Sequence, residues 1–209
     1  MKYVKMLGLA AIAAAALMAF AGASTASATV LCSTTASPCP EGQKYPAGTR
    51  IGFSLASGSS LVWINGETVL ETCKEAVLKS DISNAGSATT TVTSKNNTLS
   101  FSQCTFNNSF TKLGGLEIHN ISGTSNGTVT ATEEVGWTFN NPLFGSCIYG
   151  WTNGAVLGTL TEGKPATLDF NTTIEKLSGS AFACPANGNL NGSLVQTEPS
   201  STTLSVGAS

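Results

Sequence analysis

The chain of 209 residues has few charged side chains, which limits both its partners and its chemistry. Charged residues make up 11% of the sequence, against about 25% in an average soluble domain. There is one arginine, Arg50, and the lysines are scattered along the chain. A protein that binds nucleic acid instead gathers lysine and arginine on one face. The composition therefore predicts no nucleic-acid partner.

Histidine is scarcer still, because His119 is the only one. A serine-hydrolase triad needs a histidine to take the proton of the nucleophile, and no G-x-S-x-G motif accompanies this one. A zinc site is equally disfavoured, since no two cysteines show the C-x2-C spacing and no second histidine exists. We predict no metal and no cofactor, and an enzyme is the less favoured class.

Carboxylates offer the one enzymatic alternative. A glycoside hydrolase uses two carboxyl groups at a fixed separation, and candidates for such a pair are Glu133, Glu134, Asp169 and Glu175. Adjacent residues on a strand point to opposite faces, so Glu133 and Glu134 cannot be presumed to share a site. A secreted hydrolase acting on polysaccharide stays an alternative.

Long apolar runs are absent except at the N-terminus, where residues 1–28 resemble a cleavable signal peptide. Lys2 and Lys5 precede the apolar run Met6–Ala21, and Ala26-Ser27-Ala28 is a small-x-small cleavage site. The run is shorter than the roughly 18 to 20 residues of a membrane span. We predict export, a mature chain starting at Thr29 and no stable membrane anchor. Cleavage leaves 8 of the 10 basic residues against 12 acidic ones, so the net charge moves from −2 to −4.

Cysteine, by contrast, is present in an even number, and all six copies lie in the predicted mature part. In an exported chain this indicates disulfides. Six cysteines allow fifteen pairings, and we favour the sequential one, which staples neighbouring segments: Cys32 with Cys39, Cys73 with Cys104, and Cys147 with Cys184.

Short alternating segments separated by turn residues indicate an all-β protein. Thr-rich stretches with few helix formers suit strands, because β-branched side chains pack well on a pleated surface. We predict a single antiparallel β-sandwich or barrel-like domain over residues 29–209, with an irregular lead-in at 29–48. The expected strands and hairpins are 50–56, 61–64 with 67–73, 89–93 with 98–104, 116–121, 128–133, 155–161 with 166–174, and 193–197.

Four segments are predicted less simply. Glu71 to Ser83 fits either a short helix or a strand, and the sequence does not decide between them. Ser94 to Asn97 and Asn187 to Asn191 are predicted as turns. The last residues are predicted as a Ser/Thr-rich tail.

Aromatic residues are few, 7% of the chain, yet they concentrate between Trp137 and Trp151. Two interpretations stay open for this segment. The rings can form the core of the β-domain, which needs large side chains. Alternatively they can form a glycan-binding face, because sugar rings stack on flat aromatics while amides bind the hydroxyl groups. The candidate binding residues are Trp137, Tyr149, Trp151, Asn140 and Asn141.

Several short motifs are similar to those of a group of exported, cysteine-containing actinobacterial proteins of unknown function. They are Leu31-Cys32, Pro38-Cys39-Pro40, Tyr45-Pro46-Ala47-Gly48-Thr49, Leu99 to Cys104, Pro165 to Leu168, and Cys184-Pro185. The resemblance covers nearly the whole mature chain. It implies a compact, β-rich bacterial domain with paired cysteines, and no catalytic residue, substrate or cofactor.

These observations favour a non-enzymatic exported β-domain that acts at or near the cell surface as a binding or structural module. A glycan or another cell-envelope polymer is the expected ligand. The alternatives are the carboxylate-dependent hydrolase and a self-assembling surface subunit, since low charge and Thr-rich strands leave sheet edges little protected against pairing. Oligomeric state is left open by the sequence.

Overall fold

The computed structural model describes residues 29–112 and 114–208, so the predicted signal peptide lies outside the described residues. The described chain is all-β, as the sequence predicts. It contains one short 3-10 helix, η1 (Glu41–Gln43), and fourteen strands: β1 (Thr29–Cys32), β2 (Arg50–Leu55), β3 (Leu61–Asn65), β4 (Thr68–Ser87), β5 (Thr90–Cys104), β6 (Asn108–Lys112), β7 (Leu116–Asn120), β8 (Gly127–Ala131), β9 (Val135–Asn141), β10 (Gly145–Trp151), β11 (Val156–Thr161), β12 (Thr167–Lys176), β13 (Asn187–Glu198) and β14 (Ser205–Ala208).

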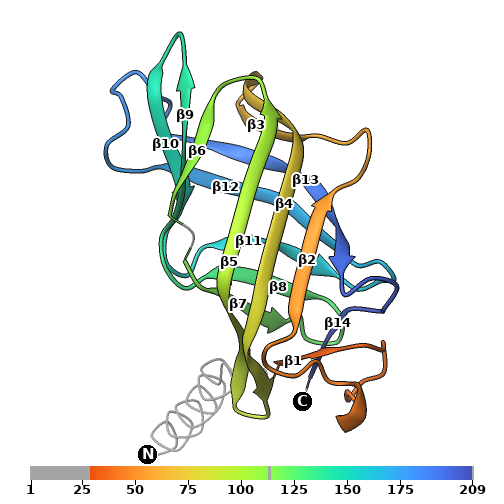
Figure 1. Cartoon of the computed structure of the whole chain (residues 1–209). Coiled ribbons are helices and arrows are strands. Elements are labelled where there is room, and N and C mark those ends of the chain that lie inside the picture. Colours follow the sequence, from red (N-terminus) through yellow and green to blue (C-terminus); the bar gives the residue numbers. More distant parts are fainter. Residues whose placement is uncertain (1–28, 113, 209) are drawn as a thin grey trace, which may run out of the picture.

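Eight strands pair antiparallel into a closed ring. Its order is β2-β4-β5-β7-β8-β11-β12-β13, and β13 pairs again with β2. Figure 1 shows β2, β4 and β5 crossing in front of β8, β11 and β12. Of the two predicted architectures, the closed pairing therefore selects the barrel-like one.

Four of the ring strands are long enough to continue beyond it. β3 inserts between the far parts of β4 and β13, while β10 pairs with the end of β12 and carries β9 and β6 beside it. The molecule is therefore elongated, with the ring at one end and this second group of strands at the other (Figure 1).

The two ends have different cores. Beyond the ring, the rings of Trp63, Trp137, Phe139, Tyr149 and Trp151 pack together, with centroids 3.9 to 6.2 Å apart. Inside the ring, the buried side chains are mostly leucine, isoleucine and valine. The aromatics of the chain thus concentrate in one half of a continuous core.

β1 and β14 form a separate two-stranded sheet across the lower end of the ring (Figure 1). Thr29 pairs with Ala208 and Cys32 with Ser205. Residues 29–48 are therefore not irregular throughout, and the predicted Ser/Thr tail contains a strand. Both predictions missed a pairing between segments more than 170 residues apart, which no local pattern reveals.

The cysteines pair as predicted. Cys32 is bonded to Cys39, Cys73 to Cys104 and Cys147 to Cys184. Three such bonds are typical of proteins from an oxidising environment.

Within the described ranges, no helix is long and apolar enough to cross a membrane.

The undecided and predicted turn segments are mostly strand. Glu71 to Ser83 lies inside the 20-residue strand β4, and residues 187–191 begin β13. Ser94 to Asn97 does not separate two strands, because β5 runs through it. Between the pairs Lys79–Thr98 and Asp81–Lys95, β5 has one residue more than β4. A β-bulge therefore stands where the polar residues suggested a turn.

Candidate functional site

The aromatic segment forms core, so its three rings are not a binding face. Trp137, Tyr149 and Trp151 are exposed by 2%, 0% and 1%. They lie on the paired strands β9 and β10, and the opposite residues Trp137 and Tyr149 point inward together. A sugar has no access to these rings in this structure. The prediction of a glycan face on them is corrected by their burial.

The two asparagines of that segment lie at the β9–β10 turn. Asn140 is exposed, whereas Asn141 is buried. The Oδ1 atom of Asn141 accepts hydrogen bonds from the backbone N–H groups of Leu143 and Phe144, at 2.8 and 3.3 Å. Asn141 therefore shapes the turn, as asparagine side chains often do, and the structure does not bring it together with Asn140 as a pair of ligand-binding amides.

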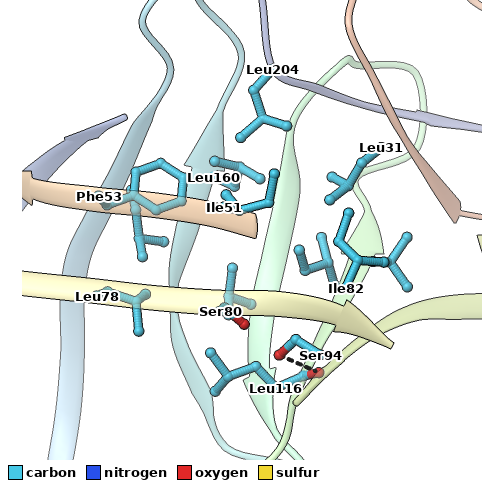
Figure 2. Close-up of a pocket in the computed structure, with 14 residues that line it drawn as sticks. Leu31, Ile51, Phe53, Leu78, Ser80, Ile82, Ser94, Leu116, Leu160 and Leu204 are labelled. Carbon is cyan, nitrogen blue, oxygen red and sulfur yellow. Dashed lines mark hydrogen bonds between the residues drawn. The ribbon is translucent and has the colours of Figure 1, made fainter. Parts of the chain in front are cut away.

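The strand ring encloses an apolar cavity of about 40 Å³. Its walls come from seven of the eight ring strands, and Leu31 and Leu204 close it at the end covered by β1 and β14. Figure 2 shows Ile51, Phe53, Leu160 and Leu204 around the space. In this measure one water needs about 10 to 15 Å³, so the cavity has room for about three waters or an alkyl group of similar size.

Two hydroxyl-bearing residues, Ser80 and Ser94, belong to the otherwise apolar wall of the cavity (Figure 2). Both hydroxyl groups donate to the Oδ1 atom of Asn97, Ser94 over 2.9 Å. The Nδ2 atom of Asn97 donates to the carbonyl oxygen of Gly114 over 2.7 Å. We call Ser80, Ser94 and Asn97 the polar gate. It is a closed network that joins β4 and β5 to the segment before β7.

A surface hollow of about 620 Å³ lies outside the ring, against the polar gate. Ser94 and Leu116 line both this outer hollow and the cavity, so they separate the two spaces. Lys95 and Glu133 are the charged residues that line the outer hollow, and both are exposed. The cavity, the polar gate and the outer hollow together form the candidate site.

The bulge in β5 explains why the wall is thin at this point. β5 pairs with β7 only from Val92 to Ser94, and beyond Ser94 the extra residue of the bulge interrupts the ladder with β4. A bulge re-aims side chains and disturbs strand pairing locally. As a result, the side chain of Asn97 fills a gap that regular strands would close with backbone hydrogen bonds.

A second unusual group is Glu71, which is 4% exposed and lies in the aromatic half of the core. Burial raises the pKa of its carboxyl group, and the backbone N–H groups of Thr72 and Phe106 partly offset this effect by donating to it. Because Phe106 lies in the connection from β5 to β6, the carboxylate satisfies backbone donors of that turn. The contacts assign Glu71 a structural role.

The residues considered for catalysis do not assemble. His119 contacts Thr130 at 3.3 Å and Glu117 at 3.6 Å on β7 and β8. Asp169 accepts hydrogen bonds from the hydroxyl groups of Thr161, Thr167 and Ser193.

The carboxylates are equally dispersed. Asp169 and Glu175 both lie on β12, six residues apart, which is about 20 Å along a strand, whereas glycosidases need roughly 5 to 9.5 Å. Glu133 and Glu134 are exposed between β8 and β9. In the described part of the chain, no group of three histidine, cysteine or acidic residues could hold a metal ion.

Sequence reasoning missed Asn97 and Glu71. Asn97 carries no signal, because a polar residue between two apolar runs reads as a turn. Glu71 carries a weak one: it lies two residues before Cys73 on the same strand, so both point to the same face, and a cysteine in a disulfide is expected inside.

No protein-family model, curated protein or solved structure matches the chain.

Proposed function

We propose that the protein is an exported, non-enzymatic binding module that holds the apolar part of a small molecule inside its strand ring. The observation that carries the proposal is the apolar cavity beside a polar gate and an outer hollow. Ligand sites are typically apolar spaces with a few placed polar groups, and this site has that composition.

The size of the cavity limits the ligand. Drug-sized ligands occupy roughly 300 to 1,000 Å³, far more than the about 40 Å³ enclosed here. The cavity therefore suits an alkyl group of about three or four carbons, with the remainder of the molecule at the gate or in the outer hollow. Deep protein interiors are usually close-packed, so a space of this size left unfilled costs stability unless a ligand occupies it.

Xenon is a suitable first probe, because it is apolar and fits small dry cavities. Methyl NMR spectra of the oxidised protein under xenon pressure are expected to shift for residues around the ring, such as Val129 and Leu160. Val129→Phe places extra atoms in the cavity and is expected to abolish these shifts. Val156→Phe is the matched control, because Val156 lies on β11 but is 45% exposed.

Circular dichroism must show that the variants are folded. If Val129→Phe is unfolded, Ile118→Phe replaces it as the cavity-filling variant. Shifts that persist in the cavity-filling variant, or their absence in the unmodified protein, would refute an accessible binding site in the ring.

A polysaccharide partner is a second candidate function, and a different surface favours it. β2 pairs with β4 as far as Val77, and β3 pairs with β4 only from Cys73. A groove of about 740 Å³, lined also by residues 56–60, lies along the stretch of β4 between these two pairings. Ser57, Ser59 and Gln103 line it with groups that can bind sugar hydroxyls. A pull-down with cell-wall polysaccharide tests it, since Gln103→Ala should weaken retention and exposed Gln43→Ala should not.

The remaining expectations stay predictions. Export requires cleavage before Thr29, which N-terminal sequencing of secreted protein can test. A bacterial origin and kinship with the exported actinobacterial group rest on the motifs named above. The self-assembly alternative needs a long exposed edge strand, and β6, which stands last in the strand order, has five residues.

A further inference from the structure

We infer that the end of the molecule away from the cavity docks reversibly on an uncharged lipid membrane through two exposed apolar side chains, Leu143 and Phe182. The inference does not depend on the cavity and adds a partner surface to the proposed function. It is carried by the exposure of these side chains, by the absence of charge around them and by the internal bonding of the backbone that presents them.

Leu143 and Phe182 are the two most exposed large apolar side chains in the described part of the chain, at 82% and 100%. Leu143 lies in the β9–β10 turn, and Phe182 lies in the connection from β12 to β13. We call these two segments, residues 142–144 and 177–186, the apolar tip.

The two segments of the apolar tip are fastened to each other. The disulfide between Cys147 and Cys184 joins β10 to the connection, and the backbone N–H of Ala181 donates to the carbonyl oxygen of Ser146 over 2.8 Å. Figure 1 shows the connection beside the β9–β10 hairpin, which projects at this end of the molecule. Both exposed side chains are therefore presented from one stapled end.

The apolar tip and the residues next to it carry no charge. None of residues 140–147 and 177–187 is an aspartate, glutamate, lysine or arginine. Moving a charged side chain into a membrane is costly, and this end of the molecule avoids that cost. It also has no cluster of basic residues, the feature by which proteins recognise anionic lipids, so an uncharged lipid surface is the expected partner.

Backbone polar groups of the apolar tip find partners inside the protein, as a membrane requires. In the turn, the side chain of Asn141 accepts from two backbone N–H groups. In the connection, the ammonium group of Lys176 donates to the carbonyl oxygens of Phe182 and Cys184, over 3.3 and 3.2 Å. These groups therefore keep their partners when water is excluded from the tip.

A membrane fits this surface better than a folded protein partner does. A stable protein interface buries roughly 1,200 to 2,000 Å² with complementary shape, whereas the apolar tip offers two large side chains on a projection. A bilayer adapts to a projection and admits apolar side chains about 5 to 10 Å into its headgroup boundary. The docking is weak and reversible, since even one fatty acyl chain is only a marginal anchor.

The test is flotation of the oxidised mature protein with phosphatidylcholine vesicles. Binding is expected on the order of millimolar lipid. Phe182→Ser should weaken it about tenfold, and Leu143→Ser/Phe182→Ser should abolish it. Val156→Ser is the matched control, because Val156 is 45% exposed but lies on β11 in the ring, and it should bind as the unmodified protein does. Circular dichroism must show that all variants are folded.

Phe182→Trp supplies a readout that a merely structural side chain would not change. This variant should keep its binding, and the emission of the added tryptophan should be quenched by brominated phosphatidylcholine. The three native tryptophans are buried, so the unmodified protein gives the baseline without quenching.

Three outcomes overturn the inference. The first is no flotation, or equal flotation of the unmodified protein and Phe182→Ser. The second is binding only to phosphatidylglycerol vesicles that is lost at 1 M salt, which would assign it to scattered lysines. The third is a concentration-dependent dimer in sedimentation that Phe182→Ser abolishes while vesicles bind nothing, which would make the apolar tip a contact between two copies of the chain.

Discussion

Replacing the cysteines of the Cys32–Cys39 or the Cys147–Cys184 disulfide by alanine should destabilise the protein by an amount set by the length of the closed loop. A disulfide restricts the unfolded chain, and in the loop-entropy relation its contribution grows with the logarithm of the number of residues enclosed. The separations are 7 residues for Cys32–Cys39 and 37 for Cys147–Cys184. The relation gives about 2.4 kcal/mol for the short loop and about 3.8 kcal/mol for the long one.

Urea unfolding of the two double variants, followed by tryptophan fluorescence, measures this difference. With a slope of about 2 kcal/mol per molar urea, the midpoint is expected to fall by about 1.2 M for Cys32→Ala/Cys39→Ala. The corresponding fall for Cys147→Ala/Cys184→Ala is about 1.9 M. Thiol titration must show that the other two bonds are intact in each variant.

The reasoning fails if the two variants lose equal stability or if the order is reversed. The reversed order would mean that the short loop contributes through the folded state, because Cys32 and Cys39 pack with Val30 in a small separate cluster beneath the ring. In that case the β1–β14 sheet, in which Cys32 lies, would be the element on which stability depends.

Three further predictions concern single side chains. Trp137→Ala should cost about 3 to 5 kcal/mol in urea unfolding because the ring is buried, whereas Phe182→Ser should cost less than about 0.5 kcal/mol because that side chain is 100% exposed. Burial raises the pKa of Glu71 above its usual 4.5. Between pH 4.5 and the raised pKa, the folded state therefore keeps a proton that the unfolded chain releases. The free energy of unfolding should fall as pH rises through this range. Glu71→Gln should flatten this dependence in urea midpoints measured from pH 4 to pH 8. Burial also raises the pKa of Tyr149 to about 12. The tyrosinate absorbance that is lost in Tyr149→Phe should therefore develop near that pH, and a lost band that develops near pH 10 would contradict its burial.

Local patterns predicted the strands that pair with a neighbour in sequence. The β11–β12 hairpin follows from alternation around Leu168, Phe170 and Ile174, which are all buried. The β3–β4 hairpin follows from Asn65-Gly66, where Gly66 has a φ of 60°. In both cases turn chemistry and a period of two act within about 15 residues, so a short window contains the full cause.

The same reasoning failed where the cause lies far away in the chain. β1 finds its partner near the opposite terminus. The side chain of Asn97 at the bulge bonds not only to Ser94 on its own strand but also to Ser80 on β4 and Gly114 before β7. Asparagine favours turns in isolation. Here its side chain instead forms part of the wall between the cavity and the outer hollow. Its amide oxygen accepts from Ser80 and Ser94, and its amide nitrogen donates to the carbonyl oxygen of Gly114.

The position of the candidate site follows from how the chain distributes its few aromatic residues. Five large rings fill the end built from β3, β9 and β10. The ring end is lined mostly by aliphatic side chains, with Phe53 among them. An eight-strand ring has an interior that side chains just fill or that holds one small ligand. Lined mostly by leucine and isoleucine, this interior keeps the cavity of about 40 Å³ on which the proposed function rests, and Ser80 and Ser94 of the polar gate lie on its wall.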